Sequence, residues 1–84
     1  MLAEQIQEIL ESNLELEYVR VQGEGNHFNV IAVGLVFEGL NRVKQQQAVY
    51  APLTEYIASN EIHALTIKAF TPKAWQDAQK FGQV

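Results

Sequence analysis

Hydrophobic and polar positions recur with more than one period along this chain of 84 residues. In the first segment, apolar side chains at Leu2, Ile6, Ile9 and Leu10 have the spacing of one helical face. Glu4, Glu8 and Glu11 lie on another face. This pattern predicts an amphipathic helix that ends near residues 12–13 and exposes an acidic face to solvent.

Three later segments have the patterns of β-strands. Residues 18–22 and residues 65–70 alternate between apolar and polar side chains, which is typical of strands with one buried and one exposed face. Residues 28–36 are nearly all apolar, so we expect this strand to lie at the centre of the sheet. The Gly-Glu-Gly-Asn sequence at 23–26 predicts a tight hairpin turn between the first two strands. Residues 37–39 are expected to end the second strand.

Polar and proline residues indicate where the remaining helices begin and end. Asn41 is a suitable N-cap for a helix that runs to about Tyr50. Pro52 cannot continue that helix, because it lacks a backbone N–H, and it is expected to open a second short helix. Asn60 is expected to end this second helix in a left-handed conformation.

The final strand leads directly into another helix start. Thr71 has the chemistry of an N-cap, and Pro72 suits the first helical position, where no N–H is needed. Trp75 then falls in the first turn of the helix, where its large apolar surface can hold the helix against the sheet.

The predicted order is helix, strand, strand, helix, helix, strand, helix, or αββααβα. This order favours an α+β fold with a layer of helices against a three-stranded sheet. The hairpin strands should pair in antiparallel fashion, and the helical crossover allows a parallel third strand, so we expect a mixed sheet. A single domain over residues 1–80 and a flexible tail over 81–84 are predicted.

Composition limits the class of protein. Hydrophobic residues make up 48% and charged residues 19% of the chain, as is usual for a soluble globular domain. No apolar run has the length of a membrane span, and the N-terminus lacks the basic start of a signal peptide. We therefore expect a cytoplasmic protein. The chain has no cysteine, so it provides neither a disulfide nor a thiolate ligand.

Charge is distributed unevenly. Residues 1–25 hold six acidic residues and one arginine, whereas residues 26–84 hold four acidic and five basic residues. Nucleic-acid-binding domains usually carry a dense basic surface, and this chain has only a sparse one. The candidate nucleic-acid contacts are Arg42, Lys44, Lys68 and Lys73.

His27 and His63 are the two histidines of the chain, the residue type whose ordinary pKa lies closest to neutral pH. One interpretation is that each is a turn residue bonded to backbone or water. The other is that the fold brings both to one edge as imidazole ligands. Two histidines do not complete a metal site, so a partner would have to supply the remaining ligands. His63 with Glu61 or Glu24 could form an acid–base pair, but the sequence has no accompanying triad, nucleophile elbow or phosphate loop. We therefore predict no enzyme activity.

Several segments together resemble the BolA family, and within it the short bacterial IbaG type. The hairpin segment is Gly-Glu-Gly-Asn-His-Phe-Asn-Val at 23–30, and Phe-Glu-Gly at 37–39 is followed by Arg-Val-Lys-Gln-Gln at 42–46. Val-Tyr at 49–50 precedes Pro-Leu at 52–53. Ile-His-Ala-Leu at 62–65 then leads to the Thr-Pro-x-x-Trp sequence at 71–75, which is the most specific part of the match.

The resemblance implies a fold like the class II KH domain and a partnership with monothiol glutaredoxins. In such a pair, a 2Fe–2S cluster is held between the two proteins, with thiolates from the glutaredoxin cysteine and its bound glutathione. His63 matches the C-terminal histidine ligand of the family, and His27 is the candidate for the ligand from the hairpin loop. The surface expected to bind the partner comprises Thr66, Lys68, Phe70, Thr71 and Trp75. The implied role is iron–sulfur trafficking or iron and stress sensing.

Two departures from related sequences bear on nucleic-acid binding. Many BolA proteins carry Arg-His-Arg in the first of the paired helices, where this chain has Lys-Gln-Gln-Gln at 44–47. The sequence also has no G-x-x-G loop, with which KH domains hold a nucleic-acid backbone. A KH-like nucleic-acid-binding transcriptional regulator is therefore the alternative hypothesis. A third is a stress-linked interaction domain whose histidines have no ligand role.

Overall fold

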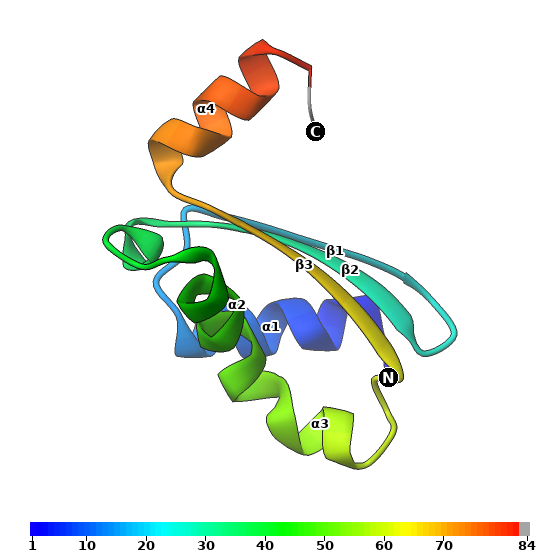
Figure 1. Cartoon of the computed structure of the whole chain (residues 1–84). Helices are drawn as coiled ribbons and strands as arrows, with labels where there is room; N and C mark the ends of the chain where they lie inside the picture. Colours follow the sequence, from blue (N-terminus) through cyan, green and yellow to red (C-terminus); the bar gives the residue numbers. More distant parts are fainter. Residues whose placement is uncertain (83–84) are drawn as a thin grey trace.

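Helices and strands follow one another in the predicted order (Figure 1). The structure is a computed structural model and describes residues 1–82. The elements are α1 (Ala3–Asn13), β1 (Tyr18–Glu24), β2 (His27–Val33), the 3-10 turn η1 (Leu35–Phe37), α2 (Arg42–Tyr50), the 3-10 turn η2 (Ala51–Leu53), α3 (Thr54–Ala58), β3 (Ala64–Phe70) and α4 (Pro72–Lys80).

The strands form one mixed sheet in the order β1-β2-β3. β1 and β2 are antiparallel, whereas β2 and β3 are parallel, and Val30 of β2 lies between Val21 and Ile67 in register. The central position of β2 explains its nearly continuous apolar sequence, because both of its faces are covered in part. The predicted mixed sheet with a central second strand is confirmed.

One face of the sheet packs against α1, α2 and α3, which lie together on one side of it in Figure 1. Alternation along the strands directs Val21, Val30 and Ile67 to this face. Helix and loop residues complete the core with side chains that are almost fully buried, namely Ile6, Leu10, Phe37, Val49, Leu53 and Ile62. The predicted α+β architecture is therefore confirmed.

No helix within residues 1–82 covers most of the opposite face of the sheet, and we call it the open face. It presents Tyr18, Arg20 and Gln22 of β1, His27, Asn29, Ile31 and Val33 of β2, and Thr66, Lys68 and Phe70 of β3.

Helix α4 covers only one end of the open face. The Trp75 ring stacks on Tyr18 with ring centroids 5.3 Å apart and packs at an angle against Phe70, also at 5.3 Å. Val33 lies between Tyr18 and Phe70 in register and is 1% exposed. Trp75 thus holds α4 against the sheet, as its place in the first helical turn predicted.

The predicted helix caps are present. The Asn41 side-chain oxygen accepts a hydrogen bond from the Lys44 backbone N–H at 2.9 Å, and the Thr71 hydroxyl oxygen accepts one from the Ala74 N–H at 3.2 Å. Asn60 has a φ of 67°, the left-handed conformation expected after α3. These contacts pair N–H groups that the first helical turn leaves without partners.

The hairpin turn is shorter than predicted. β1 continues to Glu24, which pairs with His27, so the turn contains only Gly25 and Asn26. Gly25 has a φ of 62° and occupies the first central position, where glycine is favoured. Gly23 belongs to the strand, where it pairs with Phe28, and a Cβ there would overlap the Phe28 ring. The Phe28 side chain fills the space that a residue larger than glycine would need.

The second strand ends earlier than predicted. β2 stops at Val33 and the chain enters η1, which exposes Leu35 and Val36 and buries Phe37. Gly34 remains extended and packs closely against the loop before β1, since a Cβ there would lie 2.7 Å from the Glu15 backbone oxygen. The turn at η1 then places the Phe37 side chain in the core. The predicted strand over 34–36 is therefore wrong. Phe81 is exposed, and residues 83–84 of the predicted tail lie outside the described residues.

Candidate metal centre

His27 and His63 lie side by side at one end of the sheet. His27 is the first residue of β2 and pairs with Ala64 of β3, whereas His63 immediately precedes β3. The Asn26 carbonyl oxygen accepts hydrogen bonds from the His63 N–H at 2.8 Å and the Ala64 N–H at 3.2 Å. The backbone therefore ties the start of β3 to the hairpin turn, and residues distant in sequence become neighbours.

The two imidazole rings have a separation suited to a shared ion. Their centroids are 5.6 Å apart and their planes are inclined by 48°. For two imidazoles bonded to one tetrahedral metal through bonds of about 2 Å, the centroids would be roughly 5 Å apart. Both histidines are exposed, so small side-chain rotations can make up the difference. The pair fits the chemistry of two ligands to one metal ion.

The histidine pair does not form a complete site. Across residues 1–82, no third histidine, cysteine, aspartate or glutamate joins it in a group that could hold a metal ion. Glu61 accepts a hydrogen bond from the Ser59 hydroxyl at 3.1 Å, and Glu24 pairs with His27 across the hairpin. The chain can therefore offer two neutral nitrogen ligands, and a complete site needs donors from outside it.

The residues predicted to bind a partner divide into two groups. Thr66, Lys68 and Phe70 share the open face, which extends from the histidine pair toward α4. Trp75 reaches this face through its contacts with Tyr18 and Phe70. The Thr71 hydroxyl caps α4, which is a structural role.

Sequence reasoning did not identify three further residues of the open face. Arg20, Gln22 and Asn29 line a shallow hollow of about 200 Å³ together with Thr66 and Lys68. Alternation indicated that Arg20 and Gln22 share one side of β1. Only the strand register reveals that this side is shared with Lys68, because alternation within one strand does not say how it aligns with another.

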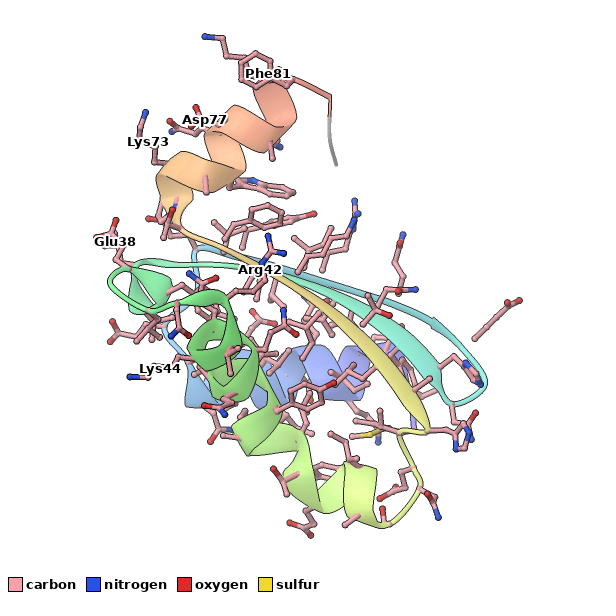
Figure 2. The ribbon with its side chains drawn as sticks, in the orientation of Figure 1. Glu38, Arg42, Lys44, Lys73, Asp77 and Phe81 are labelled. Atoms are coloured by element: carbon pink, nitrogen blue, oxygen red, sulfur yellow. The ribbon has the colours of Figure 1, made fainter. Side chains whose placement is uncertain are left out.

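The candidate nucleic-acid residues do not gather on one surface. Arg42 and Lys68 line a hollow of about 350 Å³ between α2, β3 and α4. Figure 2 shows Lys44 extending from α2 and Lys73 from α4, each away from Arg42. A continuous basic surface, the usual basis of nucleic-acid affinity, is not formed by these four side chains.

Replacement of Trp75 by alanine is expected to loosen α4. The change removes both aromatic contacts, and we expect the free energy of unfolding to fall by about 1–3 kcal/mol, less than for a fully buried tryptophan. Urea denaturation followed by far-ultraviolet circular dichroism measures the change. Trp75→Phe is the matched control and should retain most of the stability. Equal stability of Trp75→Ala and wild type would show that the aromatic contacts do not hold the helix.

The helices of the described region, residues 1–82, are all too short or too polar to cross a membrane.

Comparisons with known proteins agree with this architecture. A family model described as BolA-like protein matches residues 3–74. The acid stress protein IbaG of Escherichia coli is 55% identical over 76 residues, which cover 90% of each chain. The solved structure of BolA1 from Arabidopsis thaliana has a TM-score of 0.76 and 33% identity, covering 84% of this chain and 92% of that one. A bol-like protein from Babesia bovis has a TM-score of 0.82 and 26% identity, covering 94% of each chain. The protein therefore belongs to the BolA-like family.

Proposed function

We propose that this protein is a non-enzymatic partner of a monothiol glutaredoxin and supplies histidine ligands to a shared 2Fe–2S cluster. The observation that supports this function best is the exposed pair His27 and His63, with ring centroids 5.6 Å apart. The partner would contribute thiolates from its own cysteine and from bound glutathione. A role in iron–sulfur trafficking or in iron and stress sensing follows from such a shared site.

The composition of the ligand set supports a shared site over a resident one. The chain has no cysteine, and iron–sulfur clusters are held mainly by thiolates. Two neutral imidazoles would replace two anionic thiolates at one iron, which raises the reduction potential of a cluster. Because the imidazoles are exposed at the sheet edge, a second protein can approach them without any opening of the fold.

The open face provides a surface for that second protein next to the histidines. It presents mainly polar side chains between the histidine pair and the aromatic group of Tyr18, Phe70 and Trp75. Arg20 and Lys68 lie on either side of Ile31 in register and give the middle of this face a positive charge. A partner with acidic residues around its cluster ligands would match this surface.

The name of the Escherichia coli relative connects that protein with acid stress. We extend a stress-related role and a cytoplasmic location to this chain as part of the proposal. The nucleic-acid alternative has less support, because its four basic candidates do not form one surface.

The proposed function is tested by titrating a cluster-loaded monothiol glutaredoxin with this protein. Visible circular dichroism is recorded at each addition. We expect a spectral change that saturates at one molecule of this protein for each glutaredoxin, because histidine ligation alters the electronic environment of the cluster. An unchanged spectrum throughout the titration would contradict the shared cluster. Nucleic-acid binding that weakens steeply with salt would then support the alternative.

A further inference from the structure

A hollow of about 350 Å³ lies at the outer edge of β3, between α2 and α4. β3 is the last strand of the sheet, and its residues 67–70 form one wall of the hollow. The histidine pair lies at the other end of this strand, next to Ala64. Ala64 and Lys68 are about 13 Å apart along a strand. The hollow is therefore distinct from the candidate metal centre.

Two cationic side chains from different elements line the hollow. Arg42 is the first residue of α2, and Lys68 lies in β3. The described lining residues include no aspartate or glutamate. Asp77 belongs to α4, but Figure 2 shows it on the same side of that helix as Lys73. The two positive charges are thus not neutralised within the described lining, and the hollow favours a negatively charged ligand.

The edge of β3 adds a backbone donor to these charges. The Gln46 side-chain amide donates a hydrogen bond to the Ile67 carbonyl oxygen at 2.9 Å, so this carbonyl points toward α2. The Phe70 carbonyl oxygen points the other way, because it accepts a hydrogen bond from the Gly34 N–H. Backbone groups in a strand alternate between the two edges, so the Ala69 N–H points to the same edge as the Ile67 carbonyl. N–H groups at a sheet edge help to bind anions.

Gln46 also restricts the shape of a ligand. A peptide that extended the sheet along β3 would pair its own N–H with the Ile67 carbonyl oxygen, but Gln46 already pairs with that oxygen. Gln45 is fixed beside it, since its amide donates hydrogen bonds to the Phe37 and Leu40 carbonyl oxygens at 3.1 and 3.2 Å. The helical wall of the hollow is held in place by these bonds. The hollow therefore suits a small molecule better than an added strand.

The lining of the hollow indicates the chemistry of that small molecule. The Arg42 guanidinium can hold an oxyanion through two parallel hydrogen bonds, and the Lys68 ammonium adds a second positive charge. A phosphate monoester has a charge of about −1.5 to −2 at pH 7 and three acceptor oxygens, so it matches two cations better than a carboxylate does. Phe70 is half-buried and lines the hollow. Its ring provides an apolar surface for the organic group of the ligand.

We propose that this hollow binds a small phosphate monoester. The phosphate group lies between Arg42, Lys68 and the Ala69 N–H, and the organic group packs against Phe70. Because both cationic side chains are exposed, the affinity is modest and falls with ionic strength. The site uses neither histidine, so it does not depend on the proposed role in a shared cluster.

Titration of the isotope-labelled protein with phenyl phosphate, followed by nuclear magnetic resonance, tests this proposal. The titration is made at neutral pH and constant ionic strength. We expect saturable shifts of the Ala69 backbone amide and the Gln46 side-chain amide. Inorganic phosphate should shift the same signals but bind more weakly, because it has no group that contacts Phe70. Since neither glutaredoxin nor a cluster is present, this result is independent of the test of the proposed function.

Charge variants identify the side chains that hold the phosphate. Arg42→Gln and Lys68→Gln should each raise the dissociation constant for phenyl phosphate at least about fivefold, because each removes one charge-assisted contact. Lys44→Gln is the matched control, since it removes one positive charge from the same helix and Figure 2 shows Lys44 pointing away from Arg42. This variant should bind within about twofold of the wild type. All three positions are exposed, and circular dichroism verifies that each variant is folded.

Three results would overturn the proposal. The first is the absence of a saturable shift with phenyl phosphate. The second is an equal loss of affinity in Lys44→Gln and Arg42→Gln, which would show a general effect of charge and not a site. The third comes from a single-stranded thymidine oligonucleotide, the other source of phosphate. If it binds more tightly than phenyl phosphate and is weakened equally by Lys44→Gln and Lys73→Gln, the basic residues belong to an extended nucleic-acid surface.

Discussion

Replacement of His63 by alanine is expected to remove most of the spectral change that this protein causes in a cluster-loaded glutaredoxin. The mutation deletes one of the two imidazoles that we propose as ligands, whose ring centroids lie 5.6 Å apart. Visible circular dichroism, recorded in parallel for wild type and variant, measures the loss. A variant spectrum identical to that of the wild type would show that His63 is not a ligand.

His27→Ala should act in the same direction as His63→Ala, because the centroids of the two rings lie only 5.6 Å apart. If only His63 affects the spectrum, the second ligand is a different group. A third outcome is that neither change affects the spectrum and that the variant lacking both histidines still binds its partner normally. This outcome would support an interaction domain whose histidines have no ligand role.

Controls for the histidine variants separate ligation from folding. Both side chains are exposed, so alanine at either position should change the free energy of unfolding by less than about 0.5 kcal/mol. Glu24→Gln is the matched control, since Glu24 pairs with His27 across the hairpin and is also exposed. This variant keeps both imidazoles and should give the wild-type spectrum.

Replacement of Phe37 by alanine should have the largest effect on stability among the changes considered. Phe37 is fully buried and joins η1 to the core between the helices and the sheet. Loss of a buried phenylalanine leaves a cavity and typically costs about 3–5 kcal/mol. A domain of this size has a total stability of only about 4–13 kcal/mol, so the variant should be close to unfolding. Urea denaturation measured by circular dichroism determines the difference.

Leu35→Ala is the matched control for Phe37→Ala. It removes an apolar side chain two positions away in the same turn, but Leu35 is 63% exposed, so the change in stability should lie within about 0.5 kcal/mol. Equal losses in the two variants would contradict the assignment of Phe37 to the core and of Leu35 to the surface.

Local patterns were sufficient to predict most of the fold. The N-caps at Asn41 and Thr71 and the left-handed end at Asn60 depend on interactions within a few residues. The mixed sheet followed from the element order and from the apolar character of β2. Such features are local or topological, so they are encoded in short stretches of sequence.

Contacts between distant segments were not predictable in this way. The apolar run at 28–36 indicated one long strand, but the strand ends at Val33, Gly34 packs against the backbone of Glu15, and the chain turns at η1. Gly23 lies in the strand opposite Phe28 and not in the predicted turn, and the Phe28 ring occupies the space that a Cβ would need. In both cases a glycine permits close packing, and the packing partner cannot be identified from the glycine alone.

The sequence by itself determined the elements, their caps, the absence of thiolate ligands and the two histidines as candidates for chemistry. Only the tertiary structure decided that these histidines are neighbours, because the parallel pairing of β2 with β3 sets their separation at 5.6 Å. It also decided that Leu35 and Val36 face water next to the side chains of Glu15 and Glu17. Strand register and the packing of loops depend on contacts across the whole chain, and periodicity within one segment does not specify them.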